Sequence, residues 1–467
     1  MNISQGLLPF HLIQDASKVL LTSFGGLPLV METFRSLGLP QSIKKELALH
    51  QREGKYQEAD YIESFVSVFA AGGDCVDDFE ILRQDEGLKK LGLRLPSPEA
   101  ARYFLNAFHE EELLEGRLPQ QAFIPEETEW LEGLAAVGRD MIKKATLKEQ
   151  PWKATIDLDA TVIESHKQQA YWTYLQEKGY QPLVAYWAEQ DMILADQFRD
   201  GNVPAGMDLF PVLKKAIGAL PPTVRLVRVR SDSAAYVHEV LDWCRKEIFG
   251  RPRIEFAISA DVTEELRAAI QAIPEEGWKP LRKVTDQGLI VGRKQWAEIE
   301  FVPSKPSRNR KMQPDRYLAI RIRPAQGELF GDGTSYHYFA VVTNIWSWDG
   351  ERLLQWQRER CGTVEKTLDI LKNDLAGGVM PAKRFFANAA WWRLNALTYN
   401  VLSVMKRKSL PSPWWSVRLK ALRYHLLCIA GRVIEHGRRL FLKIAKDHPS
   451  FHLYKEAREK LLLLSYA

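Results

Sequence analysis

Cysteine is scarce in this 467-residue chain: the four present stand far apart in the sequence, and none forms a Cys-x-x-Cys pair. This spacing indicates neither a disulfide framework nor a structural zinc site, so we expect a protein of the reducing cytoplasm. Long apolar runs are missing as well. No stretch reaches the roughly 18 uncharged apolar residues of a membrane span, and the first residues lack the basic and apolar regions of a signal peptide. We therefore expect neither membrane insertion nor secretion.

Two motifs of common enzyme classes are also missing. The chain contains no Gly-x-Ser-x-Gly, the turn that exposes the nucleophile of α/β-hydrolases. It also lacks Gly-x4-Gly-Lys-Ser/Thr, the loop whose amides bind nucleotide phosphates. Neither a serine hydrolase nor an ATP-driven enzyme is therefore expected.

The sequence does contain an ordinary globular composition with unevenly distributed charge. Hydrophobic residues make up 46% and charged residues 26% of the chain, as in folded proteins, and its length suffices for about two to four units. The net charge is +5, but residues 401–467 hold 14 Lys or Arg against 4 Asp or Glu, which gives this segment +10. Such a segment with interleaved aromatic residues suits a polyanion such as DNA, although a solvated helical face has the same composition.

Hydrophobic periodicity divides the chain into five segments. Helical spacing predicts a helical N-terminal region over residues 1–145. Short apolar runs that alternate with helices over residues 146–276 predict a mixed α/β sheet. Strand-like pieces joined by a polar, basic connector indicate a β-rich insertion over residues 277–345. Helical patterns resume over residues 346–400 and continue through a basic, helical C-terminal region over residues 401–467.

Three carboxylates stand at positions where ligand sites form. Asp159 closes the first predicted strand of the sheet, Asp232 closes a later one, and Glu365 opens a helix. Ligand sites of open α/β sheets gather at the carboxyl ends of strands, so these side chains are expected to converge. Hard oxygen ligands favour Mg²⁺, and two such ions activate water and stabilise a leaving oxygen in phosphodiester cleavage. Each carboxylate taken singly is equally typical of a cap or a turn.

Two cations flank the last of these carboxylates. Lys372 follows Glu365 by seven residues, and seven steps of about 100° return to nearly the same helix face. Arg360 lies just before the helix. Cations beside a metal-binding carboxylate suit a bound phosphate, whereas a solvated helix face with an ion pair has the same pattern.

Together these segments resemble a known family. Asp159-x-Thr161, Arg230-x-Asp232 and the stretch WQRERCGTVEKTLDILK are similar to the DDE transposases of bacterial insertion sequences. More narrowly, they resemble the branch with a β-strand insertion and a Tyr-Arg-Glu-Lys signature, in which Trp356 stands where the tyrosine is usual. The resemblance implies an α/β fold: a ribonuclease-H-like catalytic core with a mixed sheet, interrupted by the β-rich insertion and flanked by helical N- and C-terminal regions.

The resemblance also implies the chemistry. Asp159, Asp232 and Glu365 would be the catalytic residues and the ligands of two Mg²⁺ ions, with Mn²⁺ as a substitute. The reaction would be metal-dependent endonuclease cleavage of DNA followed by strand transfer. Asp157 competes with Asp159 for the first position, because alternation along a strand gives both side chains the same face.

DNA contacts follow from the same resemblance. The partners would be double-stranded DNA, namely the terminal inverted repeats and the target, with a homodimer in the synaptic complex and the protein at the nucleoid when bound. A tryptophan of the insertion would stack on a displaced base, although buried packing suits each candidate equally. The residues expected to contact DNA are Arg360, Lys372, Trp296, Trp346, Trp348, Arg308, Arg310 and Lys311.

Two other functions fit the sequence. One is a catalytically silent DNA-binding protein of the same fold, and the other is a metal-dependent nuclease without strand transfer. The complete set of acids and Lys372 favour the transposase, since nothing structural requires all of them.

Overall fold

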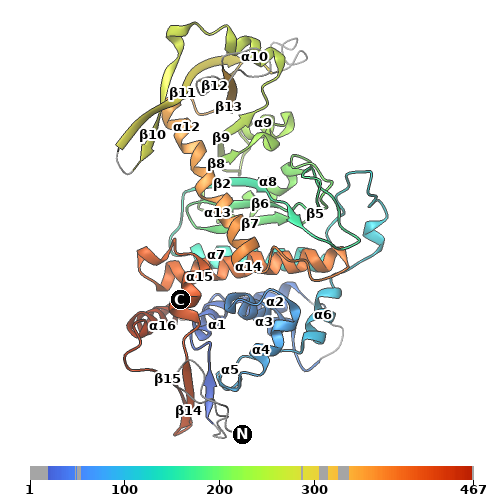
Figure 1. Ribbon diagram of the computed structural model, residues 1–467, viewed down its shortest axis with the longest axis vertical. Coiled ribbons are helices and arrows are strands. Elements are labelled where there is room, and N and C mark those ends of the chain that lie inside the picture. Colours follow the sequence, from blue (N-terminus) through green and yellow to red (C-terminus); the bar gives the residue numbers. More distant parts are fainter. Residues whose placement is uncertain are drawn as a thin grey trace, which may run out of the picture.

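A computed structural model describes residues 19–47, 49, 54–285, 288–303, 314–323 and 336–464 of the chain. Three parts follow one another along the long axis of the molecule: the N-terminal group of helices, the central sheet, and a β-rich end (Figure 1). No helix within these described ranges combines the length and the apolar character that crossing a membrane requires.

Nine strands form one mixed sheet in the order β10-β11-β12-β13-β9-β8-β2-β6-β7. The strands β2, β8 and β9 are parallel, and every other neighbouring pair is antiparallel. The carboxyl ends of β2 and β8 therefore lie side by side, and we call this end of the parallel strands the carboxyl edge of the sheet. The bounds are β2 (Lys153–Ala160), β6 (Leu183–Trp187), β7 (Met192–Gln197), β8 (Leu226–Ser231), β9 (Arg253–Ala260), β10 (Lys279–Thr285), β11 (Gly288–Phe301), β12 (Asp315–Ile322) and β13 (His337–Thr343).

Strands β2 and β6 are buried along most of their length. All five residues of β6 are buried, as are the five from Ala154 to Leu158 in β2. Near-continuous burial is expected where both faces of a strand are covered. Strands β6 and β7 pair antiparallel, and the alternating sequence Leu-Val-Arg-Val-Arg-Ser forms β8.

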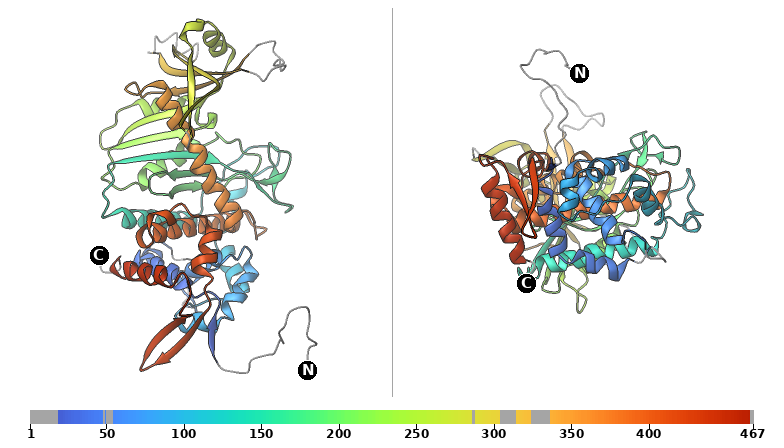
Figure 2. Two further views of the ribbon diagram at one scale, coloured as in Figure 1. Left: turned by 60° about the vertical axis from the view of Figure 1, so that its left-hand side comes forward. Right: turned by 90° about the horizontal axis from the view of Figure 1, so that it is seen from below.

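One long helix joins the sheet to the N-terminal helices. α14 (Phe385–Ser409) is buried around almost its entire surface, and it contacts β7 as well as α1, α3, α6, α7 and α16. Figures 1 and 2 show it crossing between these two layers. Trp391 on α14 packs edge-on against Phe65 and Phe69 of α3, with ring centroids 6.0 and 4.7 Å away. Because other elements cover α14 on nearly all sides, it forms the core of the lower half of the molecule.

Some of the remaining helices have a side-chain cap at their first turn. At the start of α6, the side chain of Ser97 accepts a hydrogen bond from the Ala100 amide at 3.2 Å. The bounds are α1 (Leu27–Ser36), α2 (Leu39–Glu46), α3 (Glu58–Ala71), α4 (Phe79–Arg83), α5 (Glu86–Lys90), α6 (Pro98–Asn106), α7 (Glu129–Thr146), α8 (Leu209–Ala219), α9 (His238–Arg245), α10 (Glu264–Gln271), α12 (Gly350–Arg358), α13 (Val364–Asp369), α15 (Leu419–Leu422) and α16 (Phe451–Leu464).

The C-terminal region differs from the helical expectation. It contains a hairpin of β14 (Gly431–His436) and β15 (Arg439–Ile444), which β1 (Leu20–Thr22) extends to a three-stranded sheet. Gly437 and Arg438 have φ of 57° and 59° at the turn. Two successive positive φ values are typical of the tight turn that matches the twist of a hairpin. A chain with this turn cannot continue as an α-helix.

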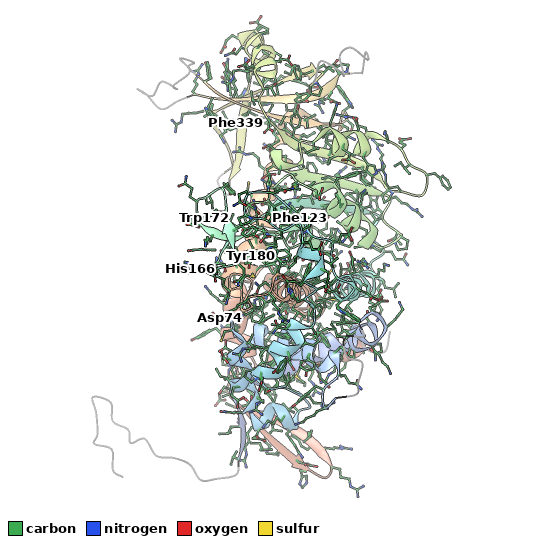
Figure 3. All side chains as sticks on the ribbon, turned by 90° about the vertical axis from the view of Figure 1, so that its right-hand side faces the viewer. Asp74, Phe123, His166, Trp172, Tyr180 and Phe339 are labelled. Carbon is green, nitrogen blue, oxygen red and sulfur yellow. The ribbon has the colours of Figure 1, made fainter. Side chains whose placement is uncertain are left out.

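A second small sheet lies directly after β2. It consists of β3 (Ile163–Glu164), β5 (Lys178–Tyr180) and β4 (Tyr171–Trp172) in that order. Tyr180 is buried, whereas Trp172 is 62% exposed and lies at the outer margin of the molecule (Figure 3). This sheet is attached to the segment that leaves the carboxyl end of β2.

Helix α7 offers a matched pair of glycines that tests the packing of the N-terminal helices. A Cβ at Gly133 would lie 2.3 Å from the carbonyl oxygen of Glu46, whereas a Cβ at Gly138 would meet nothing within 4 Å. We expect Gly133→Ala to lower the free energy of unfolding by about 1–3 kcal/mol, because the two backbones must separate. Gly138→Ala should raise it by about 0.5–1 kcal/mol, because alanine favours the helix. Denaturant unfolding measures both, and equal shifts would contradict this packing.

Candidate active site

The three candidate carboxylates gather at the carboxyl edge of β2 and β8. Asp159 is the penultimate residue of β2, Asp232 directly follows β8, and Glu365 lies in the first turn of α13. Burial raises the pKa of Asp159 to about 6; Arg360 opposes this rise, while the negative charges of Asp232 and Glu365 add to it. The three carboxylates therefore share one electrostatic environment, as the sequence predicts.

Arg360 lies between two of these acids. Its Nη1 is 3.1 Å from Oδ2 of Asp159, and its Nη2 is 3.9 Å from Oε1 of Glu365. The Arg360 side chain is only 11% exposed. A buried guanidinium without anions would be strongly destabilising, so these carboxylates hold Arg360 at the site.

Lys372 reaches the same edge of the sheet from the turn after α13. This turn, Ile370–Asp374, is a π-helical turn, and the Lys372 ammonium donates to the Val162 carbonyl at 2.7 Å and to Thr161 Oγ1 at 3.4 Å. Both acceptors lie within three residues of Asp159. Lys372 therefore contacts the strand exit that follows Asp159, and it does not contact Glu365.

Asp157 has a different environment from Asp159. It is fully buried, and Arg230 donates to both of its carboxylate oxygens at 2.6 and 2.9 Å. Thr363 Oγ1 donates to Oδ2 of the same carboxylate at 2.6 Å. Since both oxygens are engaged by neighbouring side chains, Asp157 is an internal structural anion, and Asp159 is the acid that faces Asp232 and Glu365.

The Asp157–Arg230 pair also fixes the helical segment that carries Glu365. Arg230 Nη1 donates to the Trp356 carbonyl at 2.7 Å, and it lies 3.2 Å from Oε2 of Glu359. Sequence reasoning did not find this connection. A signal was present, because Asp157 and Arg230 each stand two residues before a candidate acid, and the parallel register of β2 and β8 makes them direct partners.

Of the tryptophans expected to stack on DNA, one is exposed. Trp296 is 4% exposed and packs against Gly350, so its ring is part of the core of the β-rich end. Trp348 is half-buried between the guanidinium groups of Arg228 and Arg352, which lie 4.4 and 4.3 Å from its ring centroid. Trp346 is 55% exposed.

The exposed Trp346 lines a pocket next to β13. The pocket has a volume of about 470 Å³, and its other walls include His238, Arg245 and Asn344. The connector residues Arg308, Arg310 and Lys311, also expected to contact DNA, lie outside the described residues.

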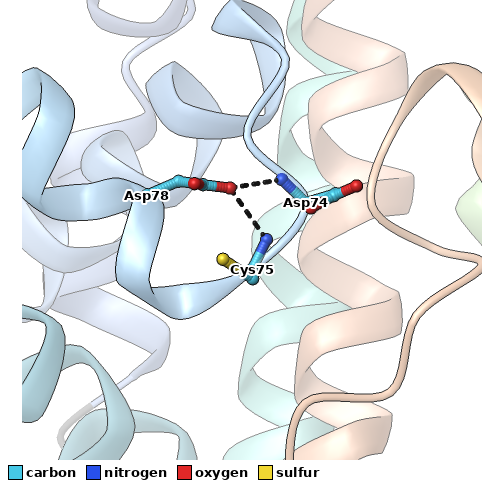
Figure 4. Close-up of side chains that lie close together, drawn as sticks. All are labelled: Asp74, Cys75 and Asp78. Atoms are coloured by element: carbon cyan, nitrogen blue, oxygen red, sulfur yellow. Dashed lines mark hydrogen bonds between the residues drawn. The ribbon is translucent and has the colours of Figure 1, made fainter.

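A second group of potential metal ligands has a structural explanation. Among the described residues, Asp74, Cys75 and Asp78 form the only group of three whose ligand atoms all lie within 4.8 Å of one another. Oδ2 of Asp78 accepts the Asp74 and Cys75 amides at 2.9 and 3.1 Å (Figure 4). This is a capped helical turn. The oxygens of Asp159, Asp232 and Glu365 are more widely spaced, with Arg360 at the site.

Comparison with known proteins identifies a family for this chain. A family model described as "Transposase DDE domain group 1" matches residues 17–466. Among solved structures, the "Cryo-EM structure of piggyBac transposase synaptic complex with hairpin DNA" has a TM-score of 0.44 and 11% sequence identity, over 96% of this chain and 83% of that chain. No curated protein matches the chain.

Arg230 pairs with a buried acid and with an exposed acid, so replacement of each acid in turn tests the Asp157–Arg230 pair. Asp157→Ala leaves a buried guanidinium without its carboxylate, so we expect the free energy of unfolding to fall by about 3–5 kcal/mol. Glu359→Ala removes a carboxylate that pairs with the same arginine but is 65% exposed, and the loss should stay below about 1 kcal/mol. Urea unfolding measures both variants. Equal losses would show that Asp157 does not hold this part of the structure together.

Proposed function

Because this chain belongs to the DDE transposase family, whose domain model matches residues 17–466, we propose that it cuts DNA at the ends of a mobile element and joins those ends to a target. We assign catalysis and metal binding to Asp159, Asp232 and Glu365. The single observation that carries this assignment is the placement of these acids at one sheet edge. Arg360 lies 3.1 Å from Asp159 and 3.9 Å from Glu365, and Asp232 adds to the rise in the pKa of Asp159 that burial causes.

The donor set suits hard divalent cations. Three carboxylates supply oxygen ligands only, and water and phosphate oxygens complete the shell that Mg²⁺ prefers. We propose two Mg²⁺ ions, with Mn²⁺ as a substitute; when bound, they supply activation of the attacking oxygen and stabilisation of the leaving oxygen. The excess negative charge around Asp159 supports this fit, because a bound cation relieves it.

Arg360 and Lys372 have roles of their own in this proposal. When neither DNA nor metal is bound, Arg360 compensates the negative charge of Asp159 and Glu365. Its planar guanidinium and the point charge of Lys372 provide donors for the oxygens of a DNA phosphate brought to the acids. Lys372 is held over the exit of β2 by Val162 and Thr161, so its ammonium is already oriented toward this edge.

We infer that the catalytic core is of the ribonuclease-H type. The order β7-β6-β2-β8-β9 supports this: an antiparallel meander of β2, β6 and β7 joined to the parallel strands β2, β8 and β9. In the proposed organisation, residues 146–276 and 346–400 form this core, and residues 277–345 form the insertion.

The flanking regions are assigned to DNA binding. We propose that residues 1–145 and the basic residues 401–467 bind the terminal inverted repeats of a bacterial insertion sequence. Two ends must be held together for transposition, which supports a homodimer in the synaptic complex. Because DNA is the proposed substrate, we place the protein at the nucleoid when it is bound to DNA.

Trp346 is the stacking residue in this proposal. It is the exposed member of the three candidate tryptophans, and it borders the pocket next to β13. Stacking of a displaced base on an aromatic ring contributes about 1–3 kcal/mol.

Cleavage of a duplex that spans the DNA flanking this gene tests the catalytic assignment. We expect Asp232→Asn and Glu365→Gln to lower Mg²⁺-dependent cleavage about 10³-fold or more, because each removes a ligand whose metal contributes several kcal/mol. Chelation should abolish cleavage by the unaltered chain. The control is Asp261→Asn, an exposed acid directly after the neighbouring strand β9, which should keep its activity.

Other outcomes of this assay separate the alternatives. Binding without cleavage under any divalent metal would favour a silent DNA-binding protein. Cleavage without joined products would favour a nuclease without strand transfer. Unchanged cleavage by both acid variants would contradict the site.

Replacement of Trp346 tests base stacking. Trp346→Ala should reduce cleavage by about 5- to 100-fold while DNA binding stays close to normal, because 1–3 kcal/mol is lost at one base. Trp152→Ala is the matched control, since Trp152 is 63% exposed but precedes β2 and does not line the pocket next to β13. The measurement is single-turnover cleavage beside equilibrium binding, and equal effects of the two variants would contradict the role of Trp346.

A further inference from the structure

One face of the hairpin β14–β15 is basic and carries no acid. In an antiparallel pair, directly opposite residues share a face, and successive residues alternate between faces. The register pairs Arg432 with Lys443, Ile434 with Phe441, and His436 with Arg439. These six residues therefore lie on one side of the hairpin, which we name the basic hairpin face.

The opposite side of the hairpin is the packed one. It carries Val433, which is 2% exposed, and Leu442, which lines a groove against α1 and α16. The one acid of the two strands, Glu435, also lies on this side, and it pairs with Lys90 of α5 at 2.6 Å. The neutralising carboxylate is therefore directed away from the basic hairpin face.

The cations of the basic hairpin face have no counter-ion among the residues that the structure describes. Arg432, Arg439 and Lys443 are exposed, and none has an ion pair with any residue that the structure describes. Arg432 and Lys443 are directly opposite each other, and like charges in that position destabilise a sheet. Folding gains nothing from this arrangement, so it indicates an anionic partner.

Apolar side chains separate Arg432 and Lys443 from Arg439. Phe441 is 42% exposed, and Ile434 lies opposite it. Leu21 of β1 lies directly opposite Arg432 on the same face and is 62% exposed, so a further apolar group borders that cation. Exposed apolar groups framed by cations fit the sugars and base edges of a nucleic acid better than a free anion.

The hairpin is built rigidly enough to present this face. Its tip is a two-residue turn, and its base is fixed by backbone hydrogen bonds from Gly25 to Ile429 at 2.7 Å and from Gly26 to Leu427 at 3.1 Å. Figures 1 and 2 show it projecting at the end of the molecule opposite to β10–β13.

We propose that the basic hairpin face binds the backbone of duplex DNA, which rests on the proposed function in taking DNA as the ligand. Arg432 and Lys443 at one end of the face stand four residues from Arg439 and its partner at the other end, or about 13 Å along the strands. This matches the major groove of B-DNA, which is about 12 Å wide, so the cations at each end face one phosphate backbone, and Ile434 and Phe441 face the groove.

Equilibrium binding of a fluorescent 30-base-pair duplex of arbitrary sequence, measured at several salt concentrations, tests the proposal. The triple variant R432Q/R439Q/K443Q should bind at least tenfold more weakly at 0.1 M salt. The slope of log K against log salt should fall by about 2–3, because three phosphate contacts are lost. R432K/R439K keeps the charges and should keep the slope.

The matched control replaces three cations that lie in the same C-terminal region but outside the basic hairpin face. K446Q/K455Q/K460Q changes the net charge equally and should alter affinity and slope little. Unfolding curves identify any variant that fails to fold, and R432K/R439K then supplies the comparison with intact charge.

The outcomes separate this proposal from the proposed function. If both triple variants weaken binding equally, general charge attracts the DNA and the face has no special role. If the unaltered chain binds and cuts DNA while the face variant binds as tightly, the proposal is wrong and the function stands. If the unaltered chain binds no duplex, both are wrong.

Discussion

The buried pair of Asp157 and Arg230 is the interaction on which the candidate site depends. A carboxylate and a guanidinium removed from water are tolerated only when each oxygen and nitrogen finds a partner, and here Thr363 and the Trp356 carbonyl complete the set. The pair joins the strand of Asp159, the strand that precedes Asp232, and the segment that precedes Glu365. Three carboxylates far apart in the sequence are brought to one edge because these elements share this buried contact.

The electrostatics of the site follow from that arrangement. Burial raises the pKa of Asp159 to about 6, and the nearby Asp232 and Glu365 add to this rise. Arg360 partly balances the charge from its position beside Asp159. Three carboxylates thus face two cations, Arg360 and Lys372, so the site keeps a net negative charge.

Much of this could be predicted from the sequence, and the failures have physical reasons. The strands β2, β6, β7 and β8 were predictable because their apolar runs are long and their alternation is regular. The hairpin β14–β15 was missed because the basic composition of residues 401–467 suggested a solvated helix, while the decisive feature was the turn at Gly437 and Arg438.

The site shows the same division. Sequence position alone indicated the three acids and Lys372, because strand ends and helix starts are recognisable. It could not distinguish Asp157 from Asp159, since both share a face of β2, and only the register with Arg230 separates them. Similarly, the burial of Trp296 against Gly350 depends on long-range packing that no local pattern reports.

Counting bound Mn²⁺ by electron paramagnetic resonance, with an element-end duplex present, tests the central claim most directly. The account predicts that the unaltered chain binds two ions and that Asp159→Asn, Asp232→Asn and Glu365→Gln each lower the occupancy or affinity at least tenfold. The Asp261→Asn control should bind as the unaltered chain does. Equal Mn²⁺ binding by all five proteins would contradict a metal centre at these carboxylates.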